Sequence, residues 1–231
     1  MSLSQVFLFQ GMTGAQLEHL QQGSLILEPQ DGSTIFAQGD AADSVYAVLG
    51  GDGHVRVGSI DRNSKALMVE VFRTGDVFGE LSVIDGATRT ASAVAEGRIR
   101  LIKLRPAAFL HALETVPCVG KALSTVLAHR LRRTYQLFQD ATFETLEVRL
   151  ARQVLYLADR EGRPTPQGLR LAHRFRQSDL ADLLGTTTRS IITILNAWRA
   201  ADLVAYDTDR ALLTVKNSAA LRAMIETAGQ P

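Results

Sequence analysis

The stretch QSDLADLLGTTTRSIITIL, residues 177–195, has the spacing of two short helices joined by a tight turn. Ser178 is a favourable N-cap and is predicted to begin the first helix. Gly185 lies where the turn requires a positive φ, which glycine adopts without steric cost. Small and apolar residues recur at the spacing that buries one face of each helix, at Leu180, Ala181, Leu184, Ile191 and Ile194. Because a chance helix pair rarely satisfies all of these positions, the stretch predicts a helix-turn-helix.

The second helix of this pair is predicted to bind double-stranded DNA. Helical phase exposes Thr187, Thr188, Arg189, Ile192, Thr193 and Asn196. Arg189 is the candidate for reading a base, because a guanidinium can bind guanine O6 and N7 together. A phosphate contact or a free surface arginine is the alternative. Phosphate contacts are expected from Arg176, Ser178 and Thr187, and Gln177 completes the predicted DNA-binding set.

A basic run precedes the helix-turn-helix. Residues 163–176 contain four Arg and one His but no acidic residue. Such a run can simply be a solvated face. Its place in the chain favours an edge that faces the phosphates of DNA.

Short β-rich segments recur with even spacing between residues 25 and 105. They are Ser24–Leu27, Thr34–Phe36, Ser44–Leu49, His54–Ser59, Leu67–Phe72, Ala91–Ala95 and Arg100–Leu104. Turn-forming residues separate them, at Pro29–Gly32, Gly39–Asp40, Gly50–Gly53, Asp61–Asn63, Gly75–Asp76 and Asp85–Gly86. This pattern predicts an all-β roll, barrel or sandwich. A short helix is predicted before it, from Thr13 to Leu20, with Thr13 as its N-cap.

Residues 107–158 carry few turn signals, and an apolar or small residue recurs there in steps of three and four. The positions are Ser124, Leu127, Leu131, Thr134, Phe138 and Ala141. Such a seam is typical of two helices that associate along their length. A helix of ~25 residues runs ~37 Å, which is too long to pack only on a small roll. The pattern therefore favours a homodimer, and a buried helix of a single domain is the alternative.

Short helices follow Phe143. The first is predicted at Glu144–Asp159 and is broken by Arg160–Pro164. Beyond the helix-turn-helix, strands at Leu203–Ala205 and Ala211–Val215 are predicted to form a wing hairpin. Trp198 is expected in the core of this domain rather than on a stacking surface.

A glycine and a carboxylate open a short helix after a strand in Phe78-Gly79-Glu80-Leu81, and an arginine follows in Arg89-Thr90-Ala91. Free N–H groups at a helix N-terminus attract phosphate, and Arg89 adds a bidentate, charge-assisted contact. Glu80 cannot bind phosphate, but it can accept hydrogen bonds from a ribose hydroxyl. The two side chains together suit a sugar phosphate. An ordinary ion pair between them is the alternative.

Composition excludes several other classes of protein. The 231 residues carry a net charge of +1 and a single cysteine, Cys118, which excludes an internal disulfide framework and a cysteine-only metal site. The histidines show no i,i+4 pair and are expected on the surface, at His19, His54, His111, His129 and His173. We expect no metal site and, in the absence of a nucleophile–base constellation or a Walker-type loop, no enzyme. No apolar run approaches the ~18 residues of a membrane span, and residues 1–10 lack the basic start of a secretory signal. A cytoplasmic protein that does not enter membranes is therefore expected.

Over nearly its full length the chain resembles the cyclic-AMP receptor protein/FNR family of bacterial transcription regulators. Gln38–Asp40, Gly75–Leu81, Arg89–Ala91 and Leu131–Ala151 carry this resemblance. It implies an α+β fold whose N-terminal, cyclic-nucleotide-binding β-roll, of the double-stranded β-helix or jelly-roll type, occupies residues 1–106. A dimerisation helix with its hinge would occupy residues 107–142, and a winged helix-turn-helix domain residues 143–231.

The resemblance also implies an effector, which is cyclic AMP or cyclic GMP, and no other cofactor. The implied ligand-binding residues are Gly79, Glu80, Leu81, Arg89, Thr90, Ala91, Thr134 and Tyr135. Glu80 would bind the ribose 2′-hydroxyl, whereas Arg89, Thr90 and the Ala91 amide would bind the cyclic phosphate. Thr134, on the dimerisation helix, would reach the base. The same architecture without a ligand, or with another effector such as a dinucleotide, is the alternative.

Three positions depart from the best-known member of this family. Tyr135 stands where the cyclic-AMP receptor protein has a serine, contributed by the second subunit, that also reaches the base. In the recognition helix, Arg189 replaces the usual glutamate and Thr193 replaces the usual arginine. A different operator is therefore expected. The remaining implied partner is RNA polymerase.

Overall fold

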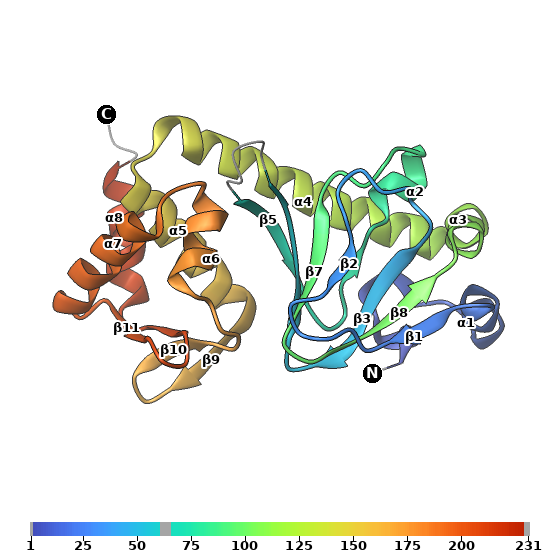
Figure 1. Cartoon of the computed structure of the whole chain (residues 1–231), viewed down its shortest axis with the longest axis horizontal. Helices are drawn as coiled ribbons and strands as arrows, with labels where there is room; N and C mark the ends of the chain where they lie inside the picture. Colours follow the sequence, from blue (N-terminus) through green and yellow to red (C-terminus); the bar gives the residue numbers. More distant parts are fainter. Residues whose placement is uncertain (1, 61–65, 229–231) are drawn as a thin grey trace. The chain divides into compact units, whose positions relative to one another are not determined.

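The structure, a computed structural model, describes residues 2–60 and 66–228 (Figure 1). The turn predicted at Asp61–Asn63 lies outside the described residues. The described residues divide into two compact units, residues 2–59 with 69–132 and residues 60 and 66–68 with 133–228, and each is described by itself.

The first unit is built on two four-stranded sheets, with strand orders β1-β8-β3-β6 and β2-β7-β4-β5. The strands are β1 (Leu25–Leu27), β2 (Thr34–Phe36), β3 (Val45–Gly51), β4 (His54–Ile60), β5 (Ala66–Phe72), β6 (Val77–Phe78), β7 (Ser92–Glu96) and β8 (Ile99–Leu104). The predicted α+β class and N-terminal roll are confirmed, and each of the seven predicted strands is present within two residues of its expected bounds. Sequence analysis placed a strand before Gly79 without bounds, because a strand of two residues, β6, leaves no alternating pattern to delimit it.

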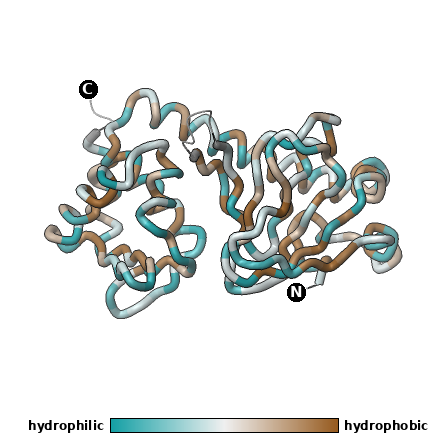
Figure 2. The backbone as a smooth tube through the Cα atoms, in the orientation of Figure 1, coloured by the Kyte–Doolittle hydropathy of each residue, from teal (hydrophilic) through white to brown (hydrophobic). Residues whose placement is uncertain are grey.

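Strand β3 lies at the centre of the core. Its first five residues are all buried, and successive side chains enter different clusters. Val45, Ala47 and Leu49 pack in the cluster that also contains residues of α3 and α4, whereas Tyr46 and Val48 pack against β7. Side chains alternate between the two faces of a strand, so a continuous apolar run is what a strand buried on both faces requires. Figure 2 shows hydrophobic residues along the strands of the roll and hydrophilic residues in its turns.

Two glycines let the β3–β4 turn approach the β7–β8 turn closely. A Cβ on Gly51, whose φ is +118°, would lie 2.0 Å from the Arg98 carbonyl oxygen. A Cβ on Gly53 would lie 2.1 Å from the Glu96 carbonyl oxygen. Both contacts are with backbone atoms, so any larger residue would have to displace a strand end.

Four helices accompany the roll: α1 (Gly14–Gln21), α2 (Leu81–Asp85), α3 (Pro106–Thr115) and α4 (Pro117–Phe143). Thr13 is the N-cap of α1, as predicted, and it forms a capping box with Gln16. The predicted seam lies on α4, which has 27 residues. Large apolar or aromatic side chains on α4 are exposed in the single chain, at Leu131, Tyr135, Phe138 and Phe143.

The second unit contains the helix-turn-helix and a four-stranded sheet of order β11-β12-β10-β9. Its elements are α5 (Leu146–Glu161), β9 (Gly162–Thr165), β10 (Gly168–Leu171), α6 (Gln177–Leu184), α7 (Thr188–Ala200), β11 (Val204–Asp207), β12 (Leu212–Val215) and α8 (Ser218–Ala228). The predicted wing is the antiparallel pair β11–β12. A further hairpin, β9–β10, was not predicted, because Arg160–Pro164 was interpreted only as a break after the preceding helix.

Three local predictions are wrong. Ser178 is not an N-cap, because α6 begins at Gln177, where the Asp179 carboxylate accepts the Arg176 N–H at 2.7 Å and draws the first turn forward. Helix α5 starts at Leu146 rather than Glu144, because Thr145 caps it. His54 is buried rather than at the surface, since it pairs with Glu96 across the sheet at 2.9 Å.

The turn glycines give a matched pair of variants. Gly51→Ala forces a left-handed conformation and a backbone clash, so we expect the first unit to lose at least the ~1–3 kcal/mol typical of such strain. Gly50→Ala is the control, because nothing lies within 4 Å of its added Cβ. Thermal denaturation followed by circular dichroism should show a lower Tm for Gly51→Ala only, and equal Tm values would contradict this account of the turn.

Candidate functional site

Six of the predicted ligand-binding residues line one cavity in the first unit. The lining comprises Phe36, Val57, Phe72, Phe78, Gly79, Glu80, Leu81, Ser82, Arg89, Thr90, Ala91 and Arg130. The structure therefore brings Gly79–Leu81 and Arg89–Ala91 together. Within the described part of the chain, Thr134 and Tyr135 fall outside this lining, are exposed on α4 and belong to the second unit. Their predicted contact with the base stays a prediction.

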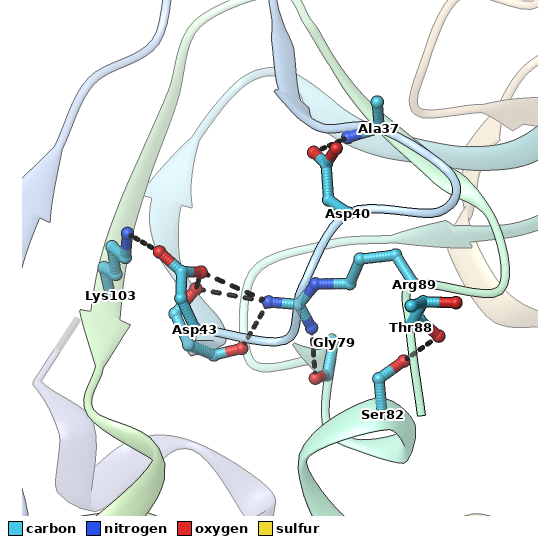
Figure 3. Close-up of polar contacts among 9 residues, drawn as sticks. Ala37, Asp40, Asp43, Gly79, Ser82, Thr88, Arg89 and Lys103 are labelled. Carbon is cyan, nitrogen blue, oxygen red and sulfur yellow. Dashed lines mark hydrogen bonds and ion pairs between the residues drawn. The ribbon is translucent and has the colours of Figure 1, made fainter. Parts of the chain in front are cut away.

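Arg89 is a buried cation, with 2% of its surface exposed. Its Nη1 donates to the Gly79 carbonyl at 2.6 Å, and its Nη2 donates to the Ser44 carbonyl at 2.7 Å and to Ser44 Oγ at 3.2 Å (Figure 3). Its guanidinium carbon lies 4.3 Å from the centre of the Phe36 ring. Nε is buried and has no hydrogen-bond partner among the described residues. The side chain is thus held in place through its two Nη atoms, while the buried Nε–H has no partner in the described part of the chain.

Backbone pairing fixes the segment that carries Arg89. The Arg89 N–H donates to the Asp40 carbonyl at 2.9 Å, and the Gly39 N–H donates to the Arg89 carbonyl at 2.8 Å. One residue earlier, the Thr88 carbonyl accepts a hydrogen bond from Ser82 Oγ in α2 at 2.9 Å. The β2–β3 loop, α2 and the Arg89 segment are therefore tied to one another (Figure 3).

Gly79 cannot carry a side chain at this place. Its φ is +77°, and an added Cβ would lie 2.9 Å from Arg89 Nη1 and 3.4 Å from the Phe36 ring. Glycine therefore allows the buried guanidinium to approach the main chain.

Arg130 is a site residue that sequence analysis missed. Glu80 is 1% exposed, and its Oε1 accepts a hydrogen bond from Arg130 Nη1 at 2.5 Å. Arg130 also donates to the Val77 carbonyl at 2.6 Å and lies over the Phe72 ring at 4.7 Å. A signal was present, because Arg130 precedes Thr134 by four residues, about one helical turn.

The charges of the cavity favour an anion. Two guanidinium groups, of Arg89 and Arg130, line it with one carboxylate, Glu80. Buried arginine donors are strong partners for phosphate, because charge-assisted hydrogen bonds gain strength away from water. Glu80 adds an acceptor that suits a hydroxyl group.

The predicted DNA-reading residues lie on one exposed helix face. Thr187 is the N-cap of α7 and accepts the Ser190 N–H at 3.2 Å. Thr187, Thr188, Arg189, Ile192, Thr193 and Asn196 are all exposed, as is Arg176 at the start of α6. Gln177 and Ser178 are half-buried in the first turn of α6. Gly185 ends α6 in the left-handed conformation, as the turn of a helix-turn-helix requires.

Helix α5 holds both helices of this motif. Trp198 of α7 is 1% exposed, as expected for a core residue, and donates from its ring to the Glu147 carboxylate at 2.8 Å. Arg149 donates to the Leu184 carbonyl at the end of α6 at 2.5 Å. Both helices of the motif are therefore bonded to α5.

Neither a membrane helix nor a metal cluster is found in the described ranges, 2–60 and 66–228. No helix there combines the length and apolarity needed to cross a bilayer. In the same ranges, no three His, Cys, Asp or Glu side chains are grouped so as to bind a metal ion.

Comparison with known proteins finds a family model that matches part of each unit. The family model of the cyclic nucleotide-binding domain matches residues 27–116, and that of the Crp-like helix-turn-helix domain matches residues 148–224. The chain is 30% identical over 192 residues to the CRP-like cAMP-activated global transcriptional regulator of Mycobacterium tuberculosis, which covers 82% of this chain and 84% of that protein.

Solved structures share the fold. A CooA mutant from Carboxydothermus hydrogenoformans superimposes with a TM-score of 0.77 at 19% identity, covering 97% of this chain and 96% of that one. The c-di-GMP responsive global regulator CLP of Xanthomonas campestris gives 0.74 at 19% identity, covering 88% and 99%.

The Glu80–Arg130 pair can be tested by removing one or both charges. Arg130→Met leaves a buried carboxylate without its cation, which costs ~3–5 kcal/mol in fully buried pairs. The loss here should be smaller, because the Arg130 side chain is 26% exposed. Glu80→Gln combined with Arg130→Met should recover most of it in urea unfolding of the first unit. Arg132→Met, an exposed arginine on the same helix, is the control, and a double variant no more stable than Arg130→Met would contradict the pairing.

Proposed function

The chain belongs to the cyclic-AMP receptor protein/FNR family of bacterial transcription regulators, and we propose that a 3′,5′-cyclic nucleotide gates its binding to DNA. The observation that supports this best is the buried Arg89 guanidinium, whose Nε lacks a partner in a cavity shared with the Glu80 carboxylate. A cyclic phosphate carries one negative charge and the acceptor oxygens that such a donor needs. A ribose 2′-hydroxyl supplies the donor that suits Glu80.

In the proposed complex each residue has a separate role. Arg89, Thr90 and the Ala91 amide bind the cyclic phosphate, and Glu80 accepts the 2′-hydroxyl. Gly79 leaves room for the guanidinium, and Leu81 supplies an apolar wall. Arg130 would neutralise the Glu80 carboxylate, with which it is in contact. Thr134 and Tyr135 would lie nearest to the base.

The effector is proposed to be cyclic AMP or cyclic GMP. The Mycobacterium tuberculosis relative is named as a cAMP-activated regulator, which favours cyclic AMP. The fold neighbour CLP is called c-di-GMP responsive, so a dinucleotide is the competing ligand. The base selectivity of this chain is expected to depend on Tyr135, which stands where the cyclic-AMP receptor protein has a serine.

We further propose that the regulator acts as a homodimer, with RNA polymerase as a later partner. Exposed Leu131 and Phe138 lie on the heptad seam of α4, and helices associate through such seams. On this proposal, residues 1–106 form the sensor domain, 107–142 the dimerisation helix and hinge, and 143–231 the DNA-binding domain. Two recognition helices then face an inverted repeat with half-site centres about 34–36 Å apart.

Arg89→Ala tests the ligand site. Losing one partner of a desolvated charge pair costs ~2–5 kcal/mol, or roughly 30- to several-thousand-fold in affinity. Calorimetry with cyclic AMP, cyclic GMP and c-di-GMP should find one mononucleotide that binds the wild type and is nearly lost in the variant. Arg98→Ala is the control, because that arginine is exposed and pairs with Asp52. Unchanged binding by a folded Arg89→Ala protein would rule out the proposed site.

DNA readout is tested by two arginine variants. Arg189→Ala should relax the preference at one position per half-site by ~1–3 kcal/mol. Arg176→Ala should weaken binding to all sequences and flatten its salt dependence, because a phosphate contact carries no base preference. Selection from random DNA with saturating nucleotide measures both, and selected sites without twofold symmetry would argue against the dimer.

A further inference from the structure

A chain of charges leads from the buried Arg89 to the outer surface of β8. Asp43 Oδ1 lies 3.6 Å from Arg89 Nη2, and Asp43 Oδ2 lies 2.7 Å from Lys103 Nζ. Asp43 is 63% exposed in its side chain, whereas Arg89 is buried. Figure 3 shows Asp43 between the two cations, with Lys103 on the side away from Gly79.

Asp43 is not what holds Arg89 in position. The guanidinium already donates at 2.6 Å to the Gly79 carbonyl and at 2.7 Å to the Ser44 carbonyl, with Ser44 Oγ at 3.2 Å. The Asp43 oxygen, at 3.6 Å, is beyond hydrogen-bond length. Its influence on Arg89 is therefore mainly that of a nearby negative charge.

That charge opposes a phosphate. An anion bound to Arg89 would share the guanidinium with Asp43, and two like charges on one cation repel each other. Lys103 reduces this repulsion, because it places a positive charge in direct contact with Asp43. A hydrogen bond from Lys103, followed by one from Ser44, lowers the pKa of Asp43. The hydrogen bond to Asp43 raises the pKa of Lys103, so both groups are charged at neutral pH.

We propose that the Asp43–Lys103 pair sets the affinity of the cavity for phosphate, with Lys103 neutralising Asp43 so that the carboxylate does not repel an anion bound to Arg89. Lys103 acts through Arg89, as a positioning residue, and has no contact of its own with the nucleotide. This inference rests on the proposed function, since it concerns the same site. The charge of the three groups is +1 in the wild type, zero in Lys103→Met, and +1 again when Asp43→Asn is added.

The experiment is calorimetry of the full chain with cyclic AMP and cyclic GMP. Lys103→Met should weaken binding about three- to tenfold, the effect of one charge a few ångströms beyond the bound anion. Lys103→Arg should stay within about twofold of the wild type, because it keeps the charge. Asp43→Asn should bind more tightly, and Asp43→Asn with Lys103→Met should return to within about twofold of the wild type.

Two controls separate charge from structure. Arg98→Met removes one cation from the Arg98–Asp52 pair, which joins the β7–β8 turn to the β3–β4 turn of the same unit, and it should change the affinity less than Lys103→Met. The loss in Lys103→Met should shrink at 1 M salt, where the screening length falls to about 3 Å, whereas a structural defect would persist. Thermal denaturation checks that each variant folds.

The other possible results separate a failure of the Asp43–Lys103 inference from a failure of the proposed function. If Asp43→Asn bound the nucleotide more weakly than the wild type, the inference would be overturned, because Asp43 would then be needed to position Arg89. Equal effects of Lys103→Met and Arg98→Met would also overturn it, since the contact with Asp43 would then be irrelevant. A wild type that binds neither nucleotide would instead refute the proposed function.

Discussion

The burial of one guanidinium group organises the first unit. A charged side chain taken out of water is costly unless hydrogen bonds replace its hydration. Arg89 meets this requirement with carbonyl oxygens from two segments, at Ser44 and Gly79, while its own main chain pairs with Gly39 and Asp40. Segments from three parts of the sequence must therefore converge before the cation can be buried. The same arrangement leaves Nε without a partner, so the roll is folded around a donor suited to an anion.

In the second unit, the main structural requirement is to hold the exposed helix α7 in a fixed orientation. A DNA-reading face needs exposed side chains, and these contribute little to the stability of the domain. The rigidity comes from the opposite face, where Trp198 is buried and bonded to Glu147 and where Arg149 caps the end of α6. Helix α5 supplies both partners. Thr145 caps α5 at its start, shortly after the end of α4.

Sequence patterns predicted the parts of this fold that depend on periodicity. The seven strands, the long helix and the helix-turn-helix follow from alternation, helical spacing and the position of Gly185. Glu80 and Arg89 were recognised by residue type and spacing, but their partners were not. Arg130 is 50 residues from Glu80, and Ser44 is 45 residues from Arg89, so no local pattern links them. Helix α6 begins at Gln177, earlier than a cap at Ser178 would allow. The Asp179 side chain, rather than that of Ser178, accepts the hydrogen bond from the free Arg176 N–H at the start of the helix. The pairing of β9 with β10 was not predicted, because Pro164, which lies in β9 opposite Leu169, was interpreted as part of a helix break.

Arg130 connects the chemistry of the cavity to the helix that carries the seam. It contacts Glu80, Val77 and Phe72 inside the roll, and the next residue along α4 is the exposed Leu131. A ligand hydroxyl that competes for Glu80 would weaken the bond from Arg130 and so change the force that holds this turn of α4 against the roll. A ligand can shift an equilibrium between two states only by its difference in affinity for them. On the proposed function, that difference arises at Glu80, where the ribose hydroxyl shares the carboxylate with Arg130 and weakens the contact between them. The phosphate and Arg89 would then supply most of the affinity, and Glu80 with Arg130 most of the coupling.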